Sequence, residues 1–324
     1  MTTNILILGM NRISVSLGLA MKKSAELVKR TGFDPDNSTV KAAIQKGALD
    51  QPVESLTAGI KDADILIYLL PAGQILEIIK VIRSDIKPGC VFIDINPIGH
   101  DTFVQLSHAL PDPNAFIAWV PALNPKYMHE QVLGPDDAQE DLFLGSHVYI
   151  AGDINTRPVV LKVGGDLAIL AGALPLYTEP DELAGILALS HDFPRLMAAV
   201  ITRLTTSEPG WNEARKLAGF DFDSLSAPLT SYENQGTPEA PLYTNRKNLQ
   251  RLIVKMVQEL QQMHESLDIE NNPELGASIK NAIVARQVWH KQRMDMSWLE
   301  KRPINPDAPH SITELMFGKR RKKS

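Results

Sequence analysis

The sequence predicts an α/β domain with a doubly wound parallel sheet, followed by an all-helical C-terminal domain. In the first half, short apolar runs rich in Ile, Leu and Val alternate with helical patterns, and each run ends at Gly or Pro. Near-continuous apolar strands suit a sheet that is covered on both faces, and their alternation with helices implies parallel crossovers. After Asp181 the pattern changes to long stretches with apolar residues at helical spacing.

The α/β domain is expected over residues 1–180. Its strands are expected at the runs NILILG, ADILIYLLP, CVFIDINP, FIAWVPAL and SHVYIAG. The later stretch RPVVLKVGGDLAILAGALPLYTEP adds one more helix and one more strand. Pro180 marks the end of this domain, because proline rarely continues a regular element.

The helical domain is expected over residues 181–318. Its first segment, DELAGILALSHDFPRLMAAVITRLTTSE, has apolar residues over several helical turns. Pro194 must either kink this helix or lie in a first turn. Residues 208–243 are rich in Pro, Gly, Ser and Asp, so we expect a loop with short turns there.

Two amphipathic helices complete the predicted helical domain, at NRKNLQRLIVKMVQELQQMHESL and at NPELGASIKNAIVARQVWHKQRM. The apolar stripe of the first consists of Leu249, Leu252, Ile253, Met256, Leu260 and Met263. Helical domains with long apolar stripes commonly dimerise, so we expect a homodimer formed through this domain.

The composition is that of an ordinary soluble globular protein, with 44% hydrophobic and 22% charged residues. The net charge of −5 argues against a polyanion-binding chain. Residues 319–324 form a basic tail, and without its five cations 28 basic residues face 38 acidic ones, a net charge of −10. Such a run is usually a solvated tail, so no nucleic-acid partner is expected.

The single cysteine, Cys90, rules out an intrachain disulfide and fits a reducing cytoplasm. Asn11 and Arg12 interrupt the first apolar run, which lacks the basic start of a signal peptide. No stretch of about 18 uninterrupted apolar residues is present, so no membrane span is expected. No cluster of Cys, His and Asp has zinc-ligand spacing, so no metal is expected.

A strand, a turn and an apolar helix are predicted at ILILGMNRISVSLGLAM, the pattern that opens a Rossmann-type dinucleotide-binding domain. A pyrophosphate binds backbone N–H groups at such a helix N-terminus. Gly9 would form the tight turn that follows the strand. Asn11 occupies the second glycine position and tolerates positive φ better than most residues, while Ser14 is small enough for the third.

An acid and a base near this turn bear on the choice of cofactor. Asp34 lies 20 residues after Ser14, where an acid binds the adenosine ribose hydroxyls and favours NAD over NADP. Arg12 could contact the pyrophosphate, or a 2′-phosphate of NADP if the acid points away. Asn96 ends a strand at the carboxyl edge of the sheet, where ligands bind in such folds, and is a candidate contact to cofactor or substrate.

With these motifs the chain resembles the prephenate/arogenate dehydrogenase family, whose members oxidatively decarboxylate prephenate or arogenate with NAD(P) in tyrosine biosynthesis. The resemblance covers most of residues 4–295. The turn resembles the family's GxGLIGGSLA, with Ile13, Ser16 and Leu17 in place. The run ADILIYLLP resembles the strand whose closing loop lines the cofactor, which assigns Leu70 and Pro71 to that loop. The last two helices resemble its helical dimerisation region.

The residues that carry the family's chemistry are changed in this chain. In the family, hydride leaves the substrate ring carbon that bears the hydroxyl while the carboxylate departs. A histidine in the family's HPMxG motif binds that hydroxyl. The matching stretch is VPALNP, which places Val120 at the histidine position. The arginine of a TRIA motif, which binds substrate carboxylate, is matched by Leu225. A GSVK turn is NPIG here. Neither Val120 nor Leu225 can perform these tasks.

The family's SHLPH motif is matched by SHDFPR, which is one residue longer. If the two motifs are aligned at their first residues, His191 matches the first histidine of the family motif. If they are aligned on Pro194 instead, Asp192 and Arg195 stand in place of the two histidines. His191 or Asp192 is then the candidate general acid or base, and Arg195 the candidate anion clamp.

Two functions follow from this resemblance. The first is an NAD(P)-dependent oxidoreductase that transfers hydride from a small-molecule carboxylate substrate, altered from prephenate or arogenate. The alternative is a catalytically inactive, dinucleotide-binding regulatory pseudoenzyme.

Overall fold

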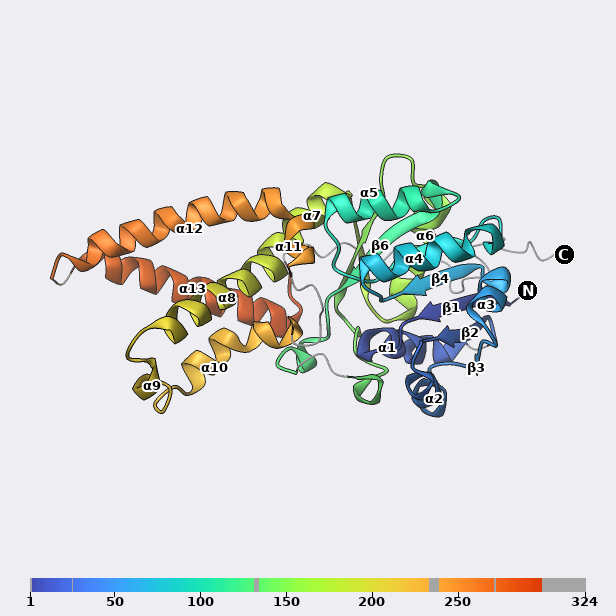
Figure 1. Ribbon diagram of the computed structural model, residues 1–324, viewed down its shortest axis with the longest axis horizontal. Coiled ribbons are helices and arrows are strands. Elements are labelled where there is room, and N and C mark those ends of the chain that lie inside the picture. Colours follow the sequence, from blue (N-terminus) through green and yellow to red (C-terminus); the bar gives the residue numbers. More distant parts are fainter. Residues whose placement is uncertain (1, 25, 131–133, 233–238, 271, 299–324) are drawn as a thin grey trace. The chain divides into compact units, whose positions relative to one another are not determined.

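The computed structural model describes residues 2–24, 26–130, 134–232, 239–270 and 272–298 (Figure 1). The chain forms two compact units. The sheet unit contains residues 1–97 and 102–180 together with the described residues from Ile283 onward. The helical unit contains residues 98–101 and 181–282. The last predicted helix therefore contributes residues to both units. The basic tail, residues 319–324, lies outside the described residues.

The sheet unit is built on one eight-stranded sheet with the strand order β3-β2-β1-β4-β5-β6-β7-β8. The order reverses direction between β1 and β4, which is where ligands bind in doubly wound folds. The strands are β1 (Thr3–Leu8), β2 (Val28–Phe33), β3 (Gln51–Pro52), β4 (Ile65–Tyr68), β5 (Val91–Asp94), β6 (Phe116–Pro121), β7 (His147–Ala151) and β8 (Leu174–Thr178). Every predicted apolar run forms a strand, so the predicted α/β class is confirmed.

One pair of strands departs from the predicted parallel sheet, because β7 runs antiparallel to β6. A parallel connection needs a crossover of a dozen or more residues, usually through a helix. The β6–β7 segment, residues 122–146, contains only the short 3₁₀ turns Pro125–Tyr127 and Pro135–Asp137 among its described residues. The chain therefore returns without crossing the sheet. The remaining neighbouring strands pair in parallel.

Helices pack on the sheet and bury its apolar strands (Figure 1). They are α1 (Arg12–Ala20), α2 (Asn37–Lys46), α3 (Leu56–Asp62), α4 (Ala72–Ile82), α5 (His100–Ala109) and α6 (Pro158–Leu170). The Trp119 indole is fully buried on β6 and donates a hydrogen bond of 2.9 Å to the Gly164 carbonyl of α6. A Cβ at Gly164 would lie 2.6 Å from the Ile117 side chain, so the glycine lets α6 approach the sheet closely.

The helical unit begins with one long helical stretch that contains a π turn. This stretch consists of α7 (Pro180–Leu187), the π turn η6 (Ala188–Asp192) and α8 (Phe193–Ser207). Pro194 lies in the first turn of α8, which is one of the two positions that the sequence allowed. Residues Pro180–Ser207 are also the one helix in the described part of the chain that is long and apolar enough to span a membrane. Length and composition alone do not distinguish it from a core helix.

The stretch from 208 to 243 was expected to form a loop, and this expectation is partly wrong. It contains α9 (Trp211–Ala214), α10 (Phe220–Ser226), the 3₁₀ segment η7 (Ala227–Tyr232) and the first residues of α11 (Ala240–Thr244). The Trp211 and Phe222 rings pack with their centroids 5.0 Å apart and stabilise this short-helix region. Gly210 and Gly219 directly precede α9 and α10, where they favour short elements.

The two predicted amphipathic helices are α12 (Arg246–Leu267) and α13 (Pro273–Asp295). Leu249 and Leu252 at the start of the predicted α12 stripe are buried. Further along the stripe, Leu260 is 54% exposed, so this later part of the stripe is not covered within the single chain.

Candidate functional site

Gly9 forms the turn between β1 and α1 and has a φ of +83°, which favours glycine. A Cβ at this position would lie 2.6 Å from the Leu69 carbonyl oxygen and 3.0 Å from a Leu70 methyl carbon. The missing side chain therefore lets the end of β4 approach the turn. The backbone N–H of Gly9 donates to the Phe33 carbonyl at 3.1 Å, which ties the turn to β2 as well.

Asn11 is the N-cap of α1 and closes a capping box. Its side-chain oxygen accepts hydrogen bonds from the backbone N–H groups of Ile13 at 2.9 Å and Ser14 at 3.1 Å. In return, the Asn11 N–H donates to the Ser14 hydroxyl at 3.0 Å, and that hydroxyl donates to the Gly9 carbonyl at 2.6 Å. Asn11 has an extended φ of −133°, so the tolerance of Asn for positive φ, which the sequence suggested, is not used.

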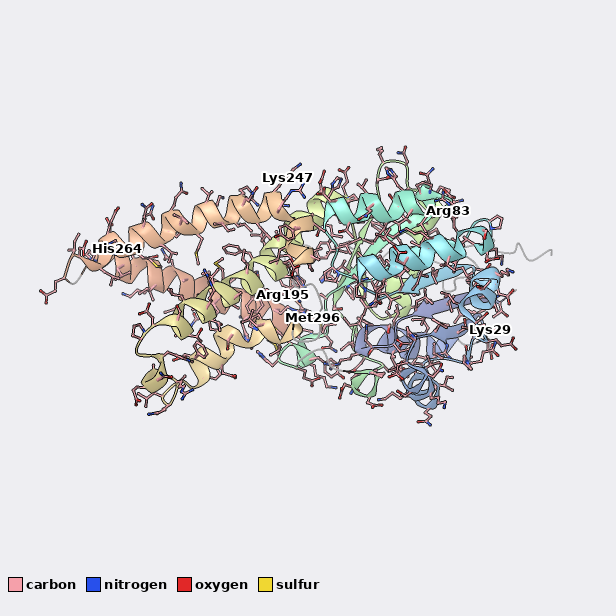
Figure 2. All side chains as sticks on the ribbon, in the orientation of Figure 1. Lys29, Arg83, Arg195, Lys247, His264 and Met296 are labelled. Carbon is pink, nitrogen blue, oxygen red and sulfur yellow. The ribbon has the colours of Figure 1, made fainter. Side chains whose placement is uncertain are left out.

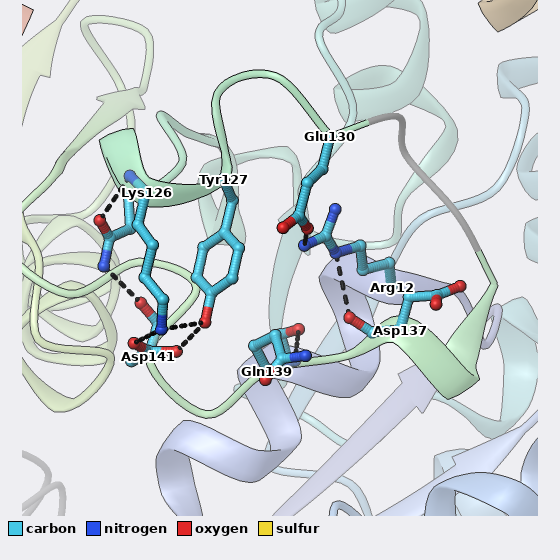
Figure 3. A network of polar contacts seen from close by, with 9 residues as sticks. Arg12, Lys126, Tyr127, Glu130, Asp137, Gln139 and Asp141 are labelled. Carbon is cyan, nitrogen blue, oxygen red and sulfur yellow. Dashed lines mark hydrogen bonds and ion pairs between the residues drawn. The ribbon is translucent and has the colours of Figure 1, made fainter.

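Arg12 is buried, with 1% of its side chain exposed, and its charge faces the β6–β7 segment (Figure 3). The guanidinium forms an ion pair with Glu130 and donates from Nε to the Asp137 carbonyl at 3.1 Å. It also lies over the Tyr127 ring, with 5.2 Å between Cζ and the ring centroid. The predicted contact of Arg12 with a phosphate stays a prediction.

The β6–β7 segment is held to α1 by further hydrogen bonds in the same region (Figure 3). The Gln139 N–H donates to the Ser16 hydroxyl of α1 at 2.9 Å. Within the segment, the Tyr127 hydroxyl donates to the Asp141 carboxylate, which also pairs with Lys126 at 3.3 Å. Sequence reasoning missed this network, because its partners lie more than 100 residues from α1 along the chain.

Asp34 follows β2 and is half-buried beside the turn. One carboxylate oxygen accepts the Met10 N–H at 2.7 Å, and the other accepts the Asp36 N–H at 2.8 Å. An ionised carboxylate offers about four acceptor sites, so these two bonds leave capacity for a ligand hydroxyl. The structure places Asp34 directly against the glycine turn, and its predicted contact with the ribose hydroxyls stays a prediction.

Asn96 lies at the carboxyl edge of the sheet and connects the ends of β4 and β5. Its side-chain amide donates to the Leu70 carbonyl at 3.1 Å and to the Asp94 carboxylate at 2.6 Å. Leu70 is half-buried, and Pro71 is the N-cap of α4. The predicted site residues Asn96, Leu70 and Pro71 therefore lie together at one edge of the sheet.

Asp94 is a buried acid that sequence reasoning did not select. It is 1% exposed and pairs in register with Tyr68 of β4. Burial raises the pKa of Asp94 to about 7, although hydrogen bonds from Asn96 oppose this shift. Burial, and then the neighbouring Asp94, also raise the pKa of Tyr68. The signal was present in the sequence as an acid within the apolar run CVFIDI.

A second polar cluster lies in the helical unit, where the π turn carries His191 and Asp192. The Ser190 hydroxyl lies 2.8 Å from Nδ1 of the half-buried His191. Burial and the charge of Arg195 lower the pKa of His191 to about 4, so this imidazole is neutral at pH 7. Arg195 follows one turn later on α8 (Figure 2).

Asp192 is 7% exposed and its carboxylate accepts a hydrogen bond of 2.8 Å from the Asn245 side-chain amide. Burial raises the pKa of Asp192, and the bond from Asn245 and the charge of Arg195 oppose the rise. Asn245 is itself buried and also donates to the Ala184 carbonyl at 2.8 Å. Sequence reasoning missed Asn245, which carries no motif.

The structure also describes the positions where the resemblance predicts changed chemistry. Val120 is 7% exposed in β6 and pairs with Tyr149 of β7. Leu225 lies on α10 and is 39% exposed. In the described ranges, no group of three or more His, Cys, Asp or Glu side chains could hold a metal ion. Cys90 is buried, and burial raises the pKa of its thiol to about 12.

Comparisons with known proteins point to one family. Residues 17–162 match the family model of the prephenate dehydrogenase nucleotide-binding domain. The match begins after the residues of the glycine turn. Prephenate dehydrogenase of Bacillus subtilis (strain 168) is 24% identical over 209 residues, which cover 63% of this chain and 54% of that protein. The enzyme of Lactococcus lactis subsp. cremoris (strain MG1363) is 34% identical over 91 residues, 28% of this chain and 25% of that protein.

The chain thus spans about half the length of the Bacillus relative that it matches. Two solved structures share the fold. Synechocystis arogenate dehydrogenase has a TM-score of 0.70 and 19% identity, covering 89% of this chain and 100% of that one. Prephenate dehydrogenase from A. aeolicus, in complex with hydroxyphenyl propionate and NAD+, has a TM-score of 0.76 and 18% identity, covering 89% and 98%. Over residues 17–162, the chain is thus similar to the nucleotide-binding domain of prephenate dehydrogenases.

Proposed function

We propose that this protein is an NAD-dependent dehydrogenase that removes hydride from a small carboxylate substrate. The match of its sheet unit to a nucleotide-binding domain carries this proposal. A structure that shares its fold holds NAD+, and curated relatives are prephenate dehydrogenases. The substrate differs from prephenate and arogenate, because Val120 and Leu225 stand where the resemblance expects the histidine and the arginine.

The residues around the glycine turn fit a dinucleotide. Gly9 leaves room that a Cβ would fill, the N-terminus of α1 supplies N–H donors, and Asp34 has acceptor capacity for ribose hydroxyls. The nicotinamide would accept the hydride when NAD is bound. The residues that we expect to hold the dinucleotide are Gly9, Asn11, Arg12, Ile13, Asp34, Leu70, Pro71 and Asn96.

The charges beside the turn favour NAD over NADP. Asp34 adjoins the turn and carries a negative charge that would repel a 2′-phosphate. Arg12 forms an ion pair with Glu130 and directs its charge toward the β6–β7 segment. NADP binding would need a cation near Asp34 to bind the 2′-phosphate. Arg12 would have to leave its ion pair with Glu130 to supply that charge.

The polar cluster of the helical unit supplies groups for the substrate. His191 is neutral at pH 7 and can accept the proton that a substrate hydroxyl loses as hydride departs. Asp192 is the alternative acid or base. Arg195 can bind a carboxylate through two parallel hydrogen bonds. We therefore assign acid–base work to His191 or Asp192 and substrate anchoring to Arg195.

The π turn explains how the extended SHDFPR segment can serve this role. A π turn contains one more residue than an α turn, and SHDFPR is one residue longer than the family pattern. π turns inside helices occur often at functional sites. The extra residue can be accommodated in this turn, which carries His191 and Asp192, while Pro194 and Arg195 follow it on α8.

A homodimer formed through the helical unit is part of the proposal. α12 and the first part of α13 carry large apolar side chains that are exposed in the single chain. They include Val254, Val257, Leu260, Leu267 and Ile279. Burial of apolar surface of this kind drives association. The single buried thiol, Cys90, is compatible with a cytoplasmic location, which we also propose.

Val120 supports a second candidate, a dinucleotide-binding regulatory protein without turnover. The side chain of Val120 is 7% exposed and has no group that can exchange a proton. Under this candidate the sheet unit binds NAD, and His191, Asp192 and Arg195 have no catalytic task.

Titration of protein fluorescence with NADH and NADPH tests the shared part of both candidates. We expect NADH to bind more tightly, and no binding of either would contradict both. NAD reduction with a panel of cyclohexadienyl and 2-oxo acid substrates then separates them. Turnover supports the dehydrogenase, whereas binding without turnover across the panel supports the regulatory protein.

Two variants test the residue roles once a substrate is found. Arg195→Lys should raise KM by about tenfold, because it loses one bidentate bond of about 1.4 kcal/mol. His191→Asn should lower kcat by about a hundredfold or more. Arg203→Lys, an exposed change on the same helix, is the matched control and should leave both constants unchanged.

A further inference from the structure

The Asn11 side chain accepts hydrogen bonds from two backbone N–H groups that would otherwise be available to a pyrophosphate. The first N–H groups of a helix have no partner within the helix and point out of its N-terminus. In this turn, the Asn11 carboxamide oxygen already accepts from Ile13 at 2.9 Å and Ser14 at 3.1 Å. A phosphate oxygen and the carboxamide oxygen would need the same donors at the same time.

Two further hydrogen bonds hold the Asn11 cap in place. The Asn11 N–H donates to the Ser14 hydroxyl at 3.0 Å, and that hydroxyl donates to the Gly9 carbonyl at 2.6 Å. Ser14 is fully buried. The three residues of the turn are thereby linked to one another, and two of the first N–H groups of α1 already have an acceptor within the chain.

The neighbouring cation does not offset this competition. Arg12 is buried beside Asn11, and its guanidinium pairs with Glu130 and the Asp137 carbonyl. Asp34 adds a negative charge on the other side of the turn, where it accepts the Met10 N–H at 2.7 Å. Nothing in these contacts attracts a phosphate strongly enough to displace the cap without a cost in binding free energy.

We propose that Asn11 sets the affinity for the dinucleotide by acting as an internal competitor for its pyrophosphate. This proposal rests on the proposed function, since it assumes that NAD binds at the turn. Binding then requires the Asn11 side chain to rotate away from Ile13 and Ser14 and to release their N–H groups. The chain consequently binds NAD more weakly than the same turn would with glycine at this position.

Two substitutions at Asn11 separate the cap from the competition. Asn11→Gly removes the carboxamide and frees both donors, and glycine at an N-cap costs little stability. Asn11→Asp keeps the cap, because Asp and Asn are equally good N-cap residues, but it adds a negative charge that faces the phosphates. Asp112→Gly, which removes a capping side chain before β6 at the opposite edge of the sheet, is the matched control.

The experiment measures the dissociation constants of NADH and ADP by calorimetry, and the thermal midpoint, for the full chain and each variant. We expect Asn11→Gly to bind both ligands about two- to threefold more tightly, the factor that the small difference between Asn and Gly at an N-cap corresponds to. Asn11→Asp should bind at least about tenfold more weakly. The thermal midpoint should be slightly lower in Asn11→Gly and unchanged in Asn11→Asp, and Asp112→Gly should leave both affinities unchanged.

The possible outcomes are distinguishable. If the native chain binds NADH and Asn11→Gly binds it no more tightly, the inference is overturned and the proposed function stands. If neither the native chain nor any variant binds NADH, the proposed function is overturned together with this inference. Measurable binding that appears only in Asn11→Gly would overturn the proposed function of the native chain, while it would still show that the Asn11 side chain competes with the dinucleotide.

Discussion

The side-chain amide of Asn245 donates a hydrogen bond of 2.8 Å to the carboxylate of Asp192, and both side chains are buried. Asn245 directly precedes α12, yet its side chain makes no cap to that helix. Its amide is instead directed to the π turn and to the Ala184 carbonyl. A buried carboxylate without a hydrogen-bond donor costs free energy. The Asn245 amide therefore stabilises the Asp192 carboxylate in the π turn.

The first prediction concerns this pair. Asn245→Ala should lower the free energy of unfolding by about 2–3 kcal/mol, because it leaves the Asp192 carboxylate buried without its donor. Chemical unfolding followed by circular dichroism measures the change. Gln250→Ala, an exposed substitution on the same helix, should change stability by less than about 0.5 kcal/mol. Equal effects of the two substitutions would contradict the assigned role of Asn245.

His191 should make stability fall as the pH is lowered. The pKa of His191 is about 4 in the folded chain and about 6.5 in the unfolded chain. Between these values the unfolded chain binds more protons, so the free energy of unfolding decreases from pH 6.5 toward pH 4. The expected loss is about 1–3 kcal/mol. Unfolding at pH 7 and pH 5 should show a smaller difference for His191→Gln than for the native chain.

Asp94 should have the opposite pH dependence. Its folded pKa is about 7 and the unfolded value is near 3.8, so the folded chain binds more protons between them. Its contribution to stability therefore decreases as the pH rises from 4 to 7. Asp94→Asn keeps an oxygen for the Asn96 donors and carries no charge, so at pH 8 it should be about 2–4 kcal/mol more stable than the native chain.

The advantage of Asp94→Asn should shrink toward pH 5, where the native carboxyl is protonated in the folded state. The exposed substitution Asp62→Asn is the control and should show no such trend. A constant difference between Asp94→Asn and the native chain from pH 5 to pH 8 would show that Asp94 does not titrate in this range.

The central strands of the sheet could be predicted from the sequence because they are buried on both faces. A strand such as Ile65–Tyr68 must then be apolar throughout, and that run is visible without any partner. The glycine turn was also predictable, because Gly9 directly follows an apolar run and Asp34 lies at a characteristic distance from it along the chain. The antiparallel direction of β7 was not predictable, because it depends on how residues 122–146 connect two strands.

The polar contacts of the candidate site could be predicted only in part. His191, Asp192 and Arg195 lie on one stretch of helix, so a motif can identify them together. Asn245 is 53 residues from Asp192 along the chain, and only folding brings the two together. The cap formed by Asn11 was also missed, because an Asn at a glycine position suggested backbone conformation rather than a side-chain acceptor.

The buried Arg12 should stabilise the contact between α1 and the β6–β7 segment. Arg12→Met keeps much of the apolar volume but removes the ion pair with Glu130 and the bond to the Asp137 carbonyl. We expect a loss of about 1–3 kcal/mol in the free energy of unfolding. Hydrogen exchange should also become faster around Gln139, whose N–H donates to Ser16. Lys126→Met, which removes an exposed ion pair with Asp141, should cost less than about 1 kcal/mol.

Gly9 and Gly73 form a matched pair for the last prediction. Gly9→Ala places a Cβ 2.6 Å from the Leu69 carbonyl at a φ of +83°, so both the backbone and the contact with β4 must shift. We expect a loss of about 2–4 kcal/mol in stability, together with loss of NADH binding. Gly73→Ala lies in the first turn of α4, where a Cβ meets no atom within 4 Å. Because alanine favours helices over glycine by about 1 kcal/mol, this variant should be slightly more stable and bind NADH normally. Thermal unfolding and NADH titration of both variants provide the measurement, and a Gly9→Ala chain with native stability would show that the turn does not need glycine.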